Sequence, residues 1–295
     1  MSDKRTVIAL GYFDSVHKGH RLVLDLAKQK ALQEGANFVV FTFESNVKAF
    51  FSGEEDTSVY TAEERLKILT DFGADQVFFA PVTKEFLSLT KREFLDYLNQ
   101  KYNICHYVSG ADFKFGAKGA GDKEYLAEYA KERNQTYTVA DTVNYAEKKI
   151  STTRIKALLA QGNVASANQM LDRTYSVSGK VFSDRKVGKK LGFPTLNIKL
   201  SNKKFRIADG VYKGHIRLEG KVYSTIINYG ARPTFGLDEK VVEAHVIGFN
   251  GDLYGKRVTL YFDAFMRKIF KFERVEDLKK QLNRDLIAVT EGNYD

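Results

Sequence analysis

Along this chain of 295 residues the hydrophobic pattern changes once, near residue 173, and this change constrains the fold more than any other feature. Before it, wholly apolar runs alternate with amphipathic helical patterns, which is typical of a parallel sheet covered by helices on both faces. We therefore predict a Rossmann-like α/β domain in residues 1–173, with two helices leading out of its end. The predicted strands span residues 7–13, 38–43, 76–82, 107–113 and 137–143, and the predicted helices span 19–33, 61–72, 90–102, 122–133, 151–160 and 164–171.

After residue 173, short strands of alternating pattern follow one another, separated by Gly, Asp and Asn. Consecutive strands with turn signals favour an antiparallel β-barrel, which a helix predicted at residues 274–289 would cap. The second domain is therefore predicted to span residues 174–295. Its strands are expected at residues 175–182, 211–218, 221–228, 240–249 and 257–265.

The net charge of +9 lies entirely in the second predicted domain. Residues 1–173 carry 23 basic and 23 acidic residues, whereas residues 174–295 carry 23 basic and 14 acidic residues. A basic half of this kind favours either a nucleic acid or a polyanionic small molecule such as ATP as the ligand. Lys203 and Lys204 belong to the excess and are expected on the surface.

Cysteine usage and apolar run length exclude two classes of protein. The single cysteine, Cys105, can form no internal disulfide, so a disulfide-stapled secreted scaffold is excluded, and we interpret this residue as a structural thiol. No apolar run approaches the roughly 18 residues that a membrane span needs, and the N-terminus lacks the apolar stretch of a signal peptide. We expect a cytoplasmic protein with no membrane partner.

The first motif joins the first predicted strand to the first predicted helix and reads Gly-Tyr-Phe-Asp-Ser-Val-His-Lys-Gly-His at residues 11–20. Its two glycines let the backbone approach a ligand closely, and the helix N-terminus offers N–H groups and a positive dipole end to an anion. His17 and His20 could hydrogen-bond to phosphate oxygens or neutralise them. The alternatives are a satisfied pair of loop histidines and half of a metal site. Metal is disfavoured because no cysteine or carboxylate cluster at ligand spacing accompanies the pair.

A second motif, Ile-Ser-Thr-Thr-Arg-Ile-Lys at residues 150–156, opens a later predicted helix. Ser151 could serve only as a helix N-cap. Three hydroxyls with the side chains of Arg154 and Lys156 around one helix start nevertheless favour a second anion site. Together the two motifs would surround a triphosphate, and their order along the chain resembles the nucleotidylyltransferase superfamily.

Further segments resemble one family more closely, the bacterial bifunctional riboflavin kinase/FAD synthetases. The resemblance covers nearly the whole chain in order, and all three prolines lie within it. It rests on residues 11–20, 42–43, 81–86, 110–116, 188–197, 228–235, 243–245 and 252–256.

This resemblance implies that the barrel phosphorylates riboflavin with ATP to give FMN. Thr195 and Asn197 would then contact Mg²⁺, for which a hydroxyl and an amide oxygen are suitable hard ligands. Glu243 would act as the general base for the ribityl hydroxyl, although a strand glutamate on a polar face is unremarkable by itself. The implied ATP contacts are Gly179, Lys180, Gly188, Lys189, Gly192 and Thr195, and the implied flavin contacts are Tyr254, Gly255 and Arg267.

The N-terminal domain would then transfer AMP from a second ATP to FMN, which releases pyrophosphate and forms FAD. The FMN phosphate is the nucleophile, so positioning and charge stabilisation would supply the catalysis. The catalytic candidates are His17, His20 and Arg154. The phosphate-binding candidates are Gly11, Phe13, Asp14, Gly19, Ser151, Thr152 and Thr153, and the flavin-binding candidates are Asp112 and Phe113.

Several positions depart from the family pattern. Ser15 stands where the family has glycine, and Ser-Asn-Val-Lys at residues 45–48 stands where Pro-His-Pro-Arg is common. Lys114, Lys156 and Lys189 replace arginines, and Asp184 replaces a common glycine. These changes motivate one rival hypothesis, a monofunctional riboflavin kinase with a degenerate N-terminal domain.

A second rival is a nucleic-acid-binding regulator that uses the basic half. The sequence contains neither an aromatic-rich RNA-binding signature nor a recognition-helix motif, which disfavours this rival. We therefore expect riboflavin, FMN and ATP as small-molecule partners and no nucleic acid. The expected assembly is a monomer or a weak homo-oligomer.

Overall fold

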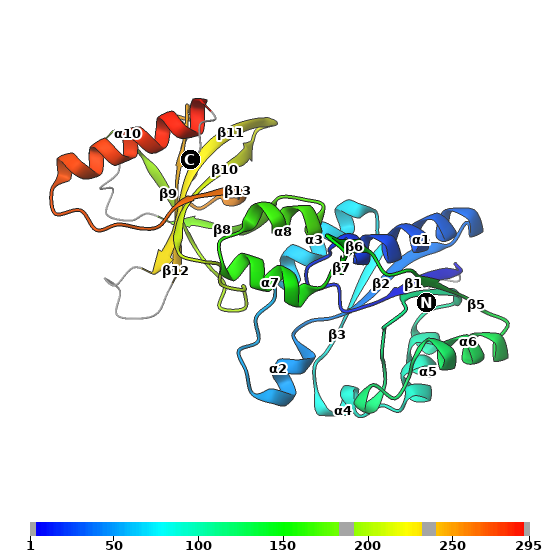
Figure 1. The fold of residues 1–295 in the computed structure, drawn as a ribbon. Helices are drawn as coiled ribbons and strands as arrows, with labels where there is room; N and C mark the ends of the chain where they lie inside the picture. Colours follow the sequence, from blue (N-terminus) through cyan, green and yellow to red (C-terminus); the bar gives the residue numbers. More distant parts are fainter. Residues whose placement is uncertain (1–3, 183–191, 232–239, 292–295) are drawn as a thin grey trace. The chain divides into compact units, whose positions relative to one another are not determined.

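The computed structural model describes residues 4–182, 192–231 and 240–291, and its chain divides into two units, Met1–Thr152 and Thr153–Asp295 (Figure 1). The sequence pattern places the domain boundary about residue 173 instead. Between these two points lie helices α7 (Thr152–Ala160) and α8 (Val164–Leu171). Helix α8 contacts strands of the second unit, so this linking region packs with the sequence that follows it. The boundary near residue 173 stays a prediction.

The first unit is built on a five-stranded sheet in which every neighbouring pair is parallel. The strand order is β3-β2-β1-β4-β5, which confirms the predicted Rossmann-like arrangement. The strands are β1 (Thr6–Leu10), β2 (Asn37–Phe43), β3 (Gln76–Ala80), β4 (Ile104–Gly110) and β5 (Thr136–Ala140). The helices are α1 (Lys18–Glu34), α2 (Val47–Ser52), α3 (Ala62–Phe72), α4 (Lys84–Leu87), α5 (Lys91–Lys101) and α6 (Lys123–Glu132), with a 3₁₀ turn η1 (Ala117–Gly119) and a hairpin of β6 (Asn144–Tyr145) and β7 (Lys148–Lys149).

Alternate residues of β1 are buried against opposite layers of helices. Val7 and Ala9 belong to a core that α1 and α3 cover, whereas Ile8 and Leu10 belong to a core that α5 and α6 cover. A strand buried on both faces is mostly apolar on both, which is why β1 has no polar alternation from Val7 to Leu10. Because β1 lies between β2 and β4, the loops after β1 and β4 flank the point where the strand order reverses. Open α/β sheets bind their ligands at that point.

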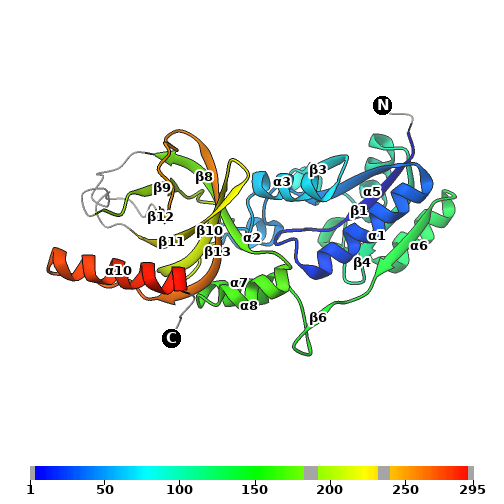
Figure 2. The ribbon, with the colours of Figure 1, turned by 90° about the horizontal axis from the view of Figure 1, so that it is seen from above.

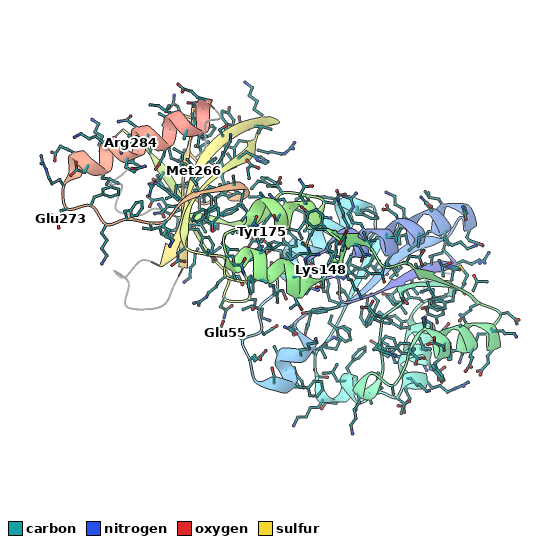
Figure 3. The ribbon with its side chains drawn as sticks, in the orientation of Figure 1. Glu55, Lys148, Tyr175, Met266, Glu273 and Arg284 are labelled. Carbon is teal, nitrogen blue, oxygen red and sulfur yellow. The ribbon has the colours of Figure 1, made fainter. Side chains whose placement is uncertain are left out.

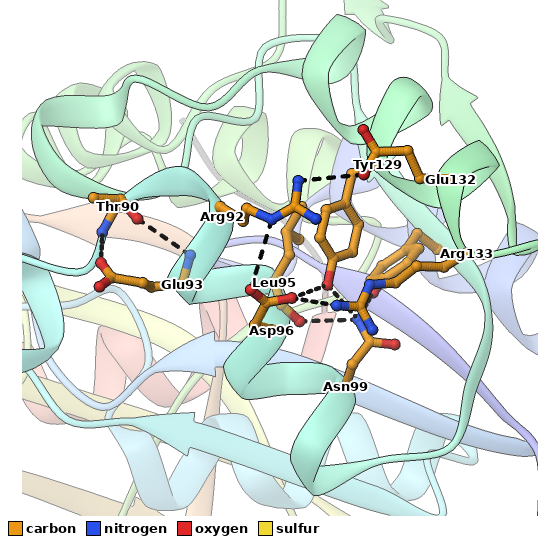
Figure 4. A network of polar contacts seen from close by, with 10 residues as sticks. Thr90, Arg92, Glu93, Leu95, Asp96, Asn99, Tyr129, Glu132 and Arg133 are labelled. Atoms are coloured by element: carbon orange, nitrogen blue, oxygen red, sulfur yellow. Dashed lines mark hydrogen bonds and ion pairs between the residues drawn. The ribbon is translucent and has the colours of Figure 1, made fainter.

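Helices α5 and α6 are joined on their outer side by a polar network (Figure 4). The carboxylate of Asp96 accepts hydrogen bonds from the Tyr129 hydroxyl at 2.7 Å and from the Arg133 guanidinium at 2.6 Å. Arg92 pairs with Glu132 at 3.2 Å across the same two helices. These partly exposed contacts align the two helices, while their apolar faces supply the burial.

His106 on β4 is buried and fully hydrogen-bonded, and it makes the stability of the first unit depend on pH. Its two ring nitrogens bond to the hydroxyls of Thr136, at 2.5 Å, and Thr138, at 3.0 Å. Burial lowers the pKa of His106 from 6.5 to about 4. The unfolded chain therefore binds more protons than the folded chain between these two pH values, so stability should fall as the pH falls through that window.

We expect the free energy of unfolding to be lower by roughly 2–3 kcal/mol near pH 4 because of His106, since one pKa unit corresponds to about 1.4 kcal/mol. The urea midpoint of the protein should stay level above pH 7 and decrease between pH 6.5 and 4. In a His106→Gln variant, whose amide keeps polar contacts but does not titrate, the decrease should be smaller. An equal decrease in both proteins would contradict the assignment.

The second unit is a closed barrel with the strand order β10-β11-β12-β9-β8-β13, in which all pairs are antiparallel. This confirms the predicted barrel, and helix α10 (Val275–Glu291) confirms the predicted terminal helix (Figure 2). The strands are β8 (Tyr175–Phe182), β9 (Thr195–Lys199), β10 (Gly210–Leu218), β11 (Lys221–Ala231), β12 (Lys240–Val246) and β13 (Arg257–Arg267). The sequence pattern did not identify β9 as a strand.

Two glycines let the barrel strands approach one another. A Cβ atom on Gly179 would lie 1.9 Å from Cγ2 of Ile198, and one on Gly214 would lie 2.1 Å from the carbonyl oxygen of Tyr261. Neither position can hold a side chain without moving a neighbouring strand. Gly179, a predicted ATP contact, therefore has a packing role in the contact between β8 and β9.

Helix α10 packs on the outside of β11 through an apolar cluster that contains Val211, Ile226 and Val289, with Met266 partly buried against it (Figure 3). The guanidinium of Arg267 binds the buried carboxylate of Asp285 on α10 through two hydrogen bonds of 2.9 and 2.6 Å. A planar fork on a carboxylate is the strongest geometry for such a pair. Within the described residues, none of the helices combines the length and apolarity needed to cross a membrane.

Lys204 corrects one expectation, because its side chain is buried rather than on the surface. Its ammonium donates to the carbonyl oxygen of Ser176 at 2.8 Å and lies 4.9 Å from the centroid of the Tyr175 ring. A hydrogen bond and an aromatic face together offset the cost of removing the charge from water. Lys203 beside it is exposed, as expected.

Candidate functional site

The loop after β1 has a strained backbone and carries the first motif. Phe13 and Val16 are fully buried and adopt positive φ angles of 39° and 45°. The left-handed region is unfavourable for a bulky or β-branched residue, and such strain concentrates at functional sites. A Cβ on Gly11 would lie 2.7 Å from the Phe13 ring, so this predicted phosphate contact also allows the loop to fold tightly.

His17 caps helix α1 and stacks on His20. Its Nδ1 accepts a hydrogen bond from the backbone N–H of His20 at 3.1 Å, and the two rings are parallel within 9° at a centroid distance of 3.7 Å. A Cβ on Gly19 would lie only 3.2 Å from Cε1 of His17, so glycine there leaves room for the imidazole. Because Nδ1 is the acceptor, Nε2 carries the proton of the neutral ring.

Both imidazoles are neutral near pH 7. Burial lowers the pKa of His17 to about 4 and holds the pKa of His20 well below 6.5, where the nearby His17 lowers it further. The sequence left open whether these histidines hydrogen-bond to phosphate or neutralise it. Their burial favours hydrogen bonding, with Nε2–H of His17 as a donor.

The two N-terminal motifs meet through a pair of hydroxyls. Ser15 Oγ lies 2.9 Å from Thr152 Oγ1, which joins the loop after β1 to the first residue of α7. Ser151 directly precedes that helix, and Thr153 and Arg154 follow in its first turn, in the second unit. Ser15 is one of the departures from the family pattern, and the structure shows that its hydroxyl forms this contact.

Asp112 lies after β4, on the other side of the strand-order reversal. Its carboxylate pairs with Lys149 Nζ at 2.6 Å. Asp112 raises the pKa of His17 and Lys149 lowers it, so both charges lie close enough to act on the imidazole. Phe113, the other predicted flavin contact, stacks on Phe115 at a centroid distance of 5.8 Å. Sequence reasoning missed Lys149, which lies outside both conspicuous motifs.

Sequence reasoning also missed Arg65 of α3, whose side chain is completely buried. It donates hydrogen bonds to the carbonyl oxygens of Phe43 at 2.8 Å and Glu44 at 2.9 Å, and to Oγ1 of Thr42 at 3.1 Å. The Thr42 hydroxyl in turn donates to the carbonyl oxygen of Tyr12 at 2.6 Å. One guanidinium thus orders the ends of β1 and β2. Only the tertiary structure reveals this, because an arginine in an amphipathic helix is expected at the surface.

Hydrogen bonds tie Asp14 to the segment that follows β2 and also order that segment internally. The buried carboxylate of Asp14 accepts from the backbone N–H of Val59 at 2.7 Å. Asn46, in the departing segment 45–48, caps α2 through its side chain, and its backbone N–H donates to Asp56 at 2.7 Å. The observed role of Asp14 is to position a neighbouring loop. Its role in phosphate binding stays a prediction.

In the second unit, three predicted kinase residues lie together on β9 and β12. The hydroxyl of Thr195 donates to Oε1 of Glu243 at 2.6 Å, and Asn197 lies directly opposite Glu243 in the strand register. Thr195 and Asn197 are two residues apart on one strand and therefore share a face. Glu243 is half-buried, with Val242 and Ala244 beside it in the barrel core, which confirms the predicted alternation.

The register extends this group into a row across five strands. The paired positions are Asn197, Glu243, Asn228, Val211 and Arg267. Residues paired across strands share a face, and at about 4.8 Å per strand the path along the curved sheet from Glu243 to Arg267 is roughly 14 Å. The exposed side chain of Asn228 is therefore a neighbour of Glu243, and it begins the segment 228–235 of the resemblance, for which no role was predicted.

The segment before β9 is held against β12. His245 Nδ1 donates to the carbonyl oxygen of Pro194 at 2.8 Å, and Phe193 meets the His245 ring edge-on at 5.4 Å. Gly192 begins this segment with a φ of 86°, a conformation that favours glycine. These contacts place Thr195 opposite His245 in the register.

Two other predicted contacts, Lys180 and Gly255, are close to each other. A Cβ on Gly255 would lie 3.9 Å from Cε of Lys180, and the Gly255 N–H donates to the carbonyl oxygen of Val181 at 2.9 Å. Tyr254 precedes Gly255 and is 47% exposed, and its contact with flavin stays a prediction. The predicted ATP contacts Gly188 and Lys189 lie outside the described residues.

The donor set of the barrel fits Mg²⁺ better than a transition metal. Within residues 4–182, 192–231 and 240–291, no three His, Cys, Asp or Glu side chains gather in a metal-binding arrangement. Thr195 and Asn197 instead offer neutral oxygens beside the Glu243 carboxylate. Mg²⁺ keeps several water and phosphate ligands and needs only a few from the protein.

Comparisons with known proteins match both units. Residues 1–154 match the family model described as FAD synthetase, and residues 171–291 match the one described as riboflavin kinase. The bifunctional riboflavin kinase/FMN adenylyltransferase of Listeria monocytogenes is 32% identical over 287 residues, which cover 96% of this chain and 91% of that protein. The protein of the same name from Bacillus subtilis is 29% identical over 95% of this chain and 90% of its own length.

A solved structure extends the likeness to the whole fold. The crystal structure titled macrolide-efflux protein from Streptococcus pneumoniae superposes with a TM-score of 0.88 at 28% identity. The match covers 100% of this chain and 96% of that one.

Proposed function

The chain belongs to the bifunctional riboflavin kinase/FMN adenylyltransferase family, and from this membership we propose that its two units catalyse successive reactions. The second unit phosphorylates riboflavin with ATP to give FMN. The first unit transfers AMP from another ATP to FMN, which yields FAD and pyrophosphate. One observation carries this proposal. Each family model matches one unit, and polar residues of the predicted motifs contact each other there, Ser15 with Thr152 in the first unit and Thr195 with Glu243 in the second.

In the kinase reaction, we assign Glu243 as the general base. The ribityl hydroxyl oxygen bonds to the γ-phosphorus, the bond from that phosphorus to the ADP oxygen breaks, and Glu243 takes the hydroxyl proton. The hydrogen bond from Thr195 orients the carboxylate. Thr195 and Asn197 would hold Mg²⁺, which when bound supplies charge neutralisation for the phosphates. Lys180 would contact ATP and Gly255 would contact the flavin, and the closeness of these two residues supports this part of the proposal.

In the adenylyl transfer, an oxygen of the FMN phosphate bonds to the α-phosphorus of ATP, and the bond from this phosphorus to the pyrophosphate oxygen breaks. No protein nucleophile is required. Neutral His17 would donate from Nε2 to a phosphate oxygen on which charge increases, and the N-terminus of α1 would add its dipole. The contact between Ser15 and Thr152 supports joint action of the two motifs.

The rival hypothesis of a monofunctional riboflavin kinase is not favoured, because the FAD synthetase model matches residues 1–154. Two of the departures that motivated it have structural roles, since Ser15 bonds to Thr152 and Asn46 caps α2. We further propose that the protein uses only small-molecule substrates, binds no nucleic acid, and works in the cytoplasm as a monomer or weak homo-oligomer.

A product time course tests both activities. With riboflavin, ATP and Mg²⁺, we expect FMN to accumulate first and FAD to follow. With FMN in place of riboflavin, FAD should form without delay. Chromatography separates the three flavins. FMN without any FAD would support the monofunctional rival, and the absence of both products would contradict the proposed function.

A further inference from the structure

The adenylyltransferase site needs a source of positive charge that its histidines do not provide. Burial keeps the rings of His17 and His20 neutral near pH 7, so they offer hydrogen bonds but no charge. The triphosphate of ATP carries several negative charges, and a cation in the site would favour its binding. Besides the predicted contact Arg154, Lys149 can supply such a cation, since its charge acts on His17.

Lys149 ends the β6–β7 hairpin immediately before the second motif. In the hairpin it is paired with Asn144, and the following residue, Ile150, donates its N–H to the carbonyl oxygen of Val143 at 3.0 Å. Three residues after Lys149, Thr152 meets the loop that leads to His17. The hairpin and this contact together hold Lys149 close to that loop. Its neighbour Lys148 lies on the opposite face of the strand, because successive strand residues alternate between faces.

The partner of Lys149 is one that a phosphate can replace. Its ammonium lies 2.6 Å from Oδ2 of Asp112, but the side chains of the two residues are 47% and 75% exposed. An ion pair this exposed to water is weak. Both charges also act on the pKa of His17, so the ion pair belongs to the electrostatic surroundings of this imidazole.

We propose that Lys149 binds the pyrophosphate portion of ATP in the first unit, and that Asp112 holds this lysine until ATP replaces the carboxylate. This inference rests on the proposed adenylyltransferase function and assigns a substrate contact within it. The hairpin keeps the ammonium near the site, so the effect of Asp112 on ATP is to compete with the phosphate for the same cation.

A Lys149→Met variant should bind ATP more weakly in the conversion of FMN to FAD. We expect the KM for ATP, and the concentration of pyrophosphate that halves the rate, to rise about 10-fold, as for the loss of one charged hydrogen bond. The KM for FMN and the conversion of riboflavin to FMN should not change. Lys149→Arg should restore most of the affinity. The matched control Lys148→Met should stay within about 2-fold of the original protein.

An Asp112→Asn variant separates this proposal from a structural role. If the ion pair only held the hairpin in place, removing either partner would weaken ATP binding. If Asp112 competes with phosphate, Asp112→Asn should lower the KM for ATP while Lys149→Met raises it. The KM for FMN is recorded separately, because Asp112 is also a predicted flavin contact.

The outcomes distinguish this inference from the proposed function. If the original protein makes no FAD from FMN and ATP, the proposed function of the first unit fails. If it makes FAD but Lys149→Met leaves both the KM for ATP and pyrophosphate inhibition unchanged, only the inference is overturned. A rise in the KM for ATP in both Lys149→Met and Asp112→Asn would also overturn it.

Discussion

Replacing Glu243 with glutamine should abolish FMN formation and leave the conversion of FMN to FAD intact. The amide keeps the size of the side chain and can still accept the hydrogen bond from Thr195, but it cannot take a proton from the ribityl hydroxyl. Loss of a general base costs about 10²–10⁴-fold in rate. We expect the loss in kcat, with little change in the KM for riboflavin, because the carboxylate is proposed to act on the proton.

The two activities are measured on the same Glu243→Gln preparation, one with riboflavin and one with FMN as substrate. Glu219→Gln is the matched control, since it makes the same change at an exposed turn between β10 and β11. It should leave both rates unchanged. A folded Glu243→Gln variant that lost both activities together would contradict the assignment of separate sites to the two units.

Replacing His17 should have the opposite pattern, with FAD formation lost and FMN formation retained. His17 has two functions that different variants separate. Its Nδ1 caps α1, and its Nε2–H is the proposed donor to phosphate. Asparagine is a good N-cap residue, so His17→Asn should preserve the start of the helix while it removes the imidazole donor. We expect a loss of about 10²–10³-fold in the rate of adenylyl transfer, as for one donor that stabilises a transition state.

His17→Ala removes both functions and should also lower the urea midpoint of the protein, by an amount that reflects roughly 1 kcal/mol for a lost cap. The comparison of the two variants separates catalysis from folding. If His17→Asn made FAD at the original rate, the imidazole would have no role in the reaction. FMN formation from riboflavin serves as the internal control in both cases.

Much of the architecture could be predicted because periodicity reports burial. A strand such as β1, apolar from Val7 to Leu10, predicts a sheet covered on both faces, and alternating strands predict the barrel. Strand β9 escaped this reasoning. Its five residues include a threonine, an asparagine and a lysine that share one face, so its apolar signal is carried by two positions only.

The site could be predicted only in part, because the motifs identify the residues that we propose act directly on substrates. Thr195 and Glu243 stand out by their motifs, and the structure places them 2.6 Å apart. The residues that position such groups carry no comparable signal. Arg65 lies outside every motif and bonds mainly to backbone carbonyls, and a carbonyl has no sequence identity that a motif could record.

By itself, the sequence determined the two architectures, the order of the motifs and the residue types available for chemistry, because periodicity and composition act over short stretches of chain. Only the tertiary structure decided the charge states of the histidines and the partners of the charged side chains. His17 is neutral because the fold buries it, Lys204 is buried although a charged residue is expected outside, and Lys149 meets Asp112 across 37 residues of chain. Burial and contacts of this kind arise from long-range packing, which local sequence patterns do not encode.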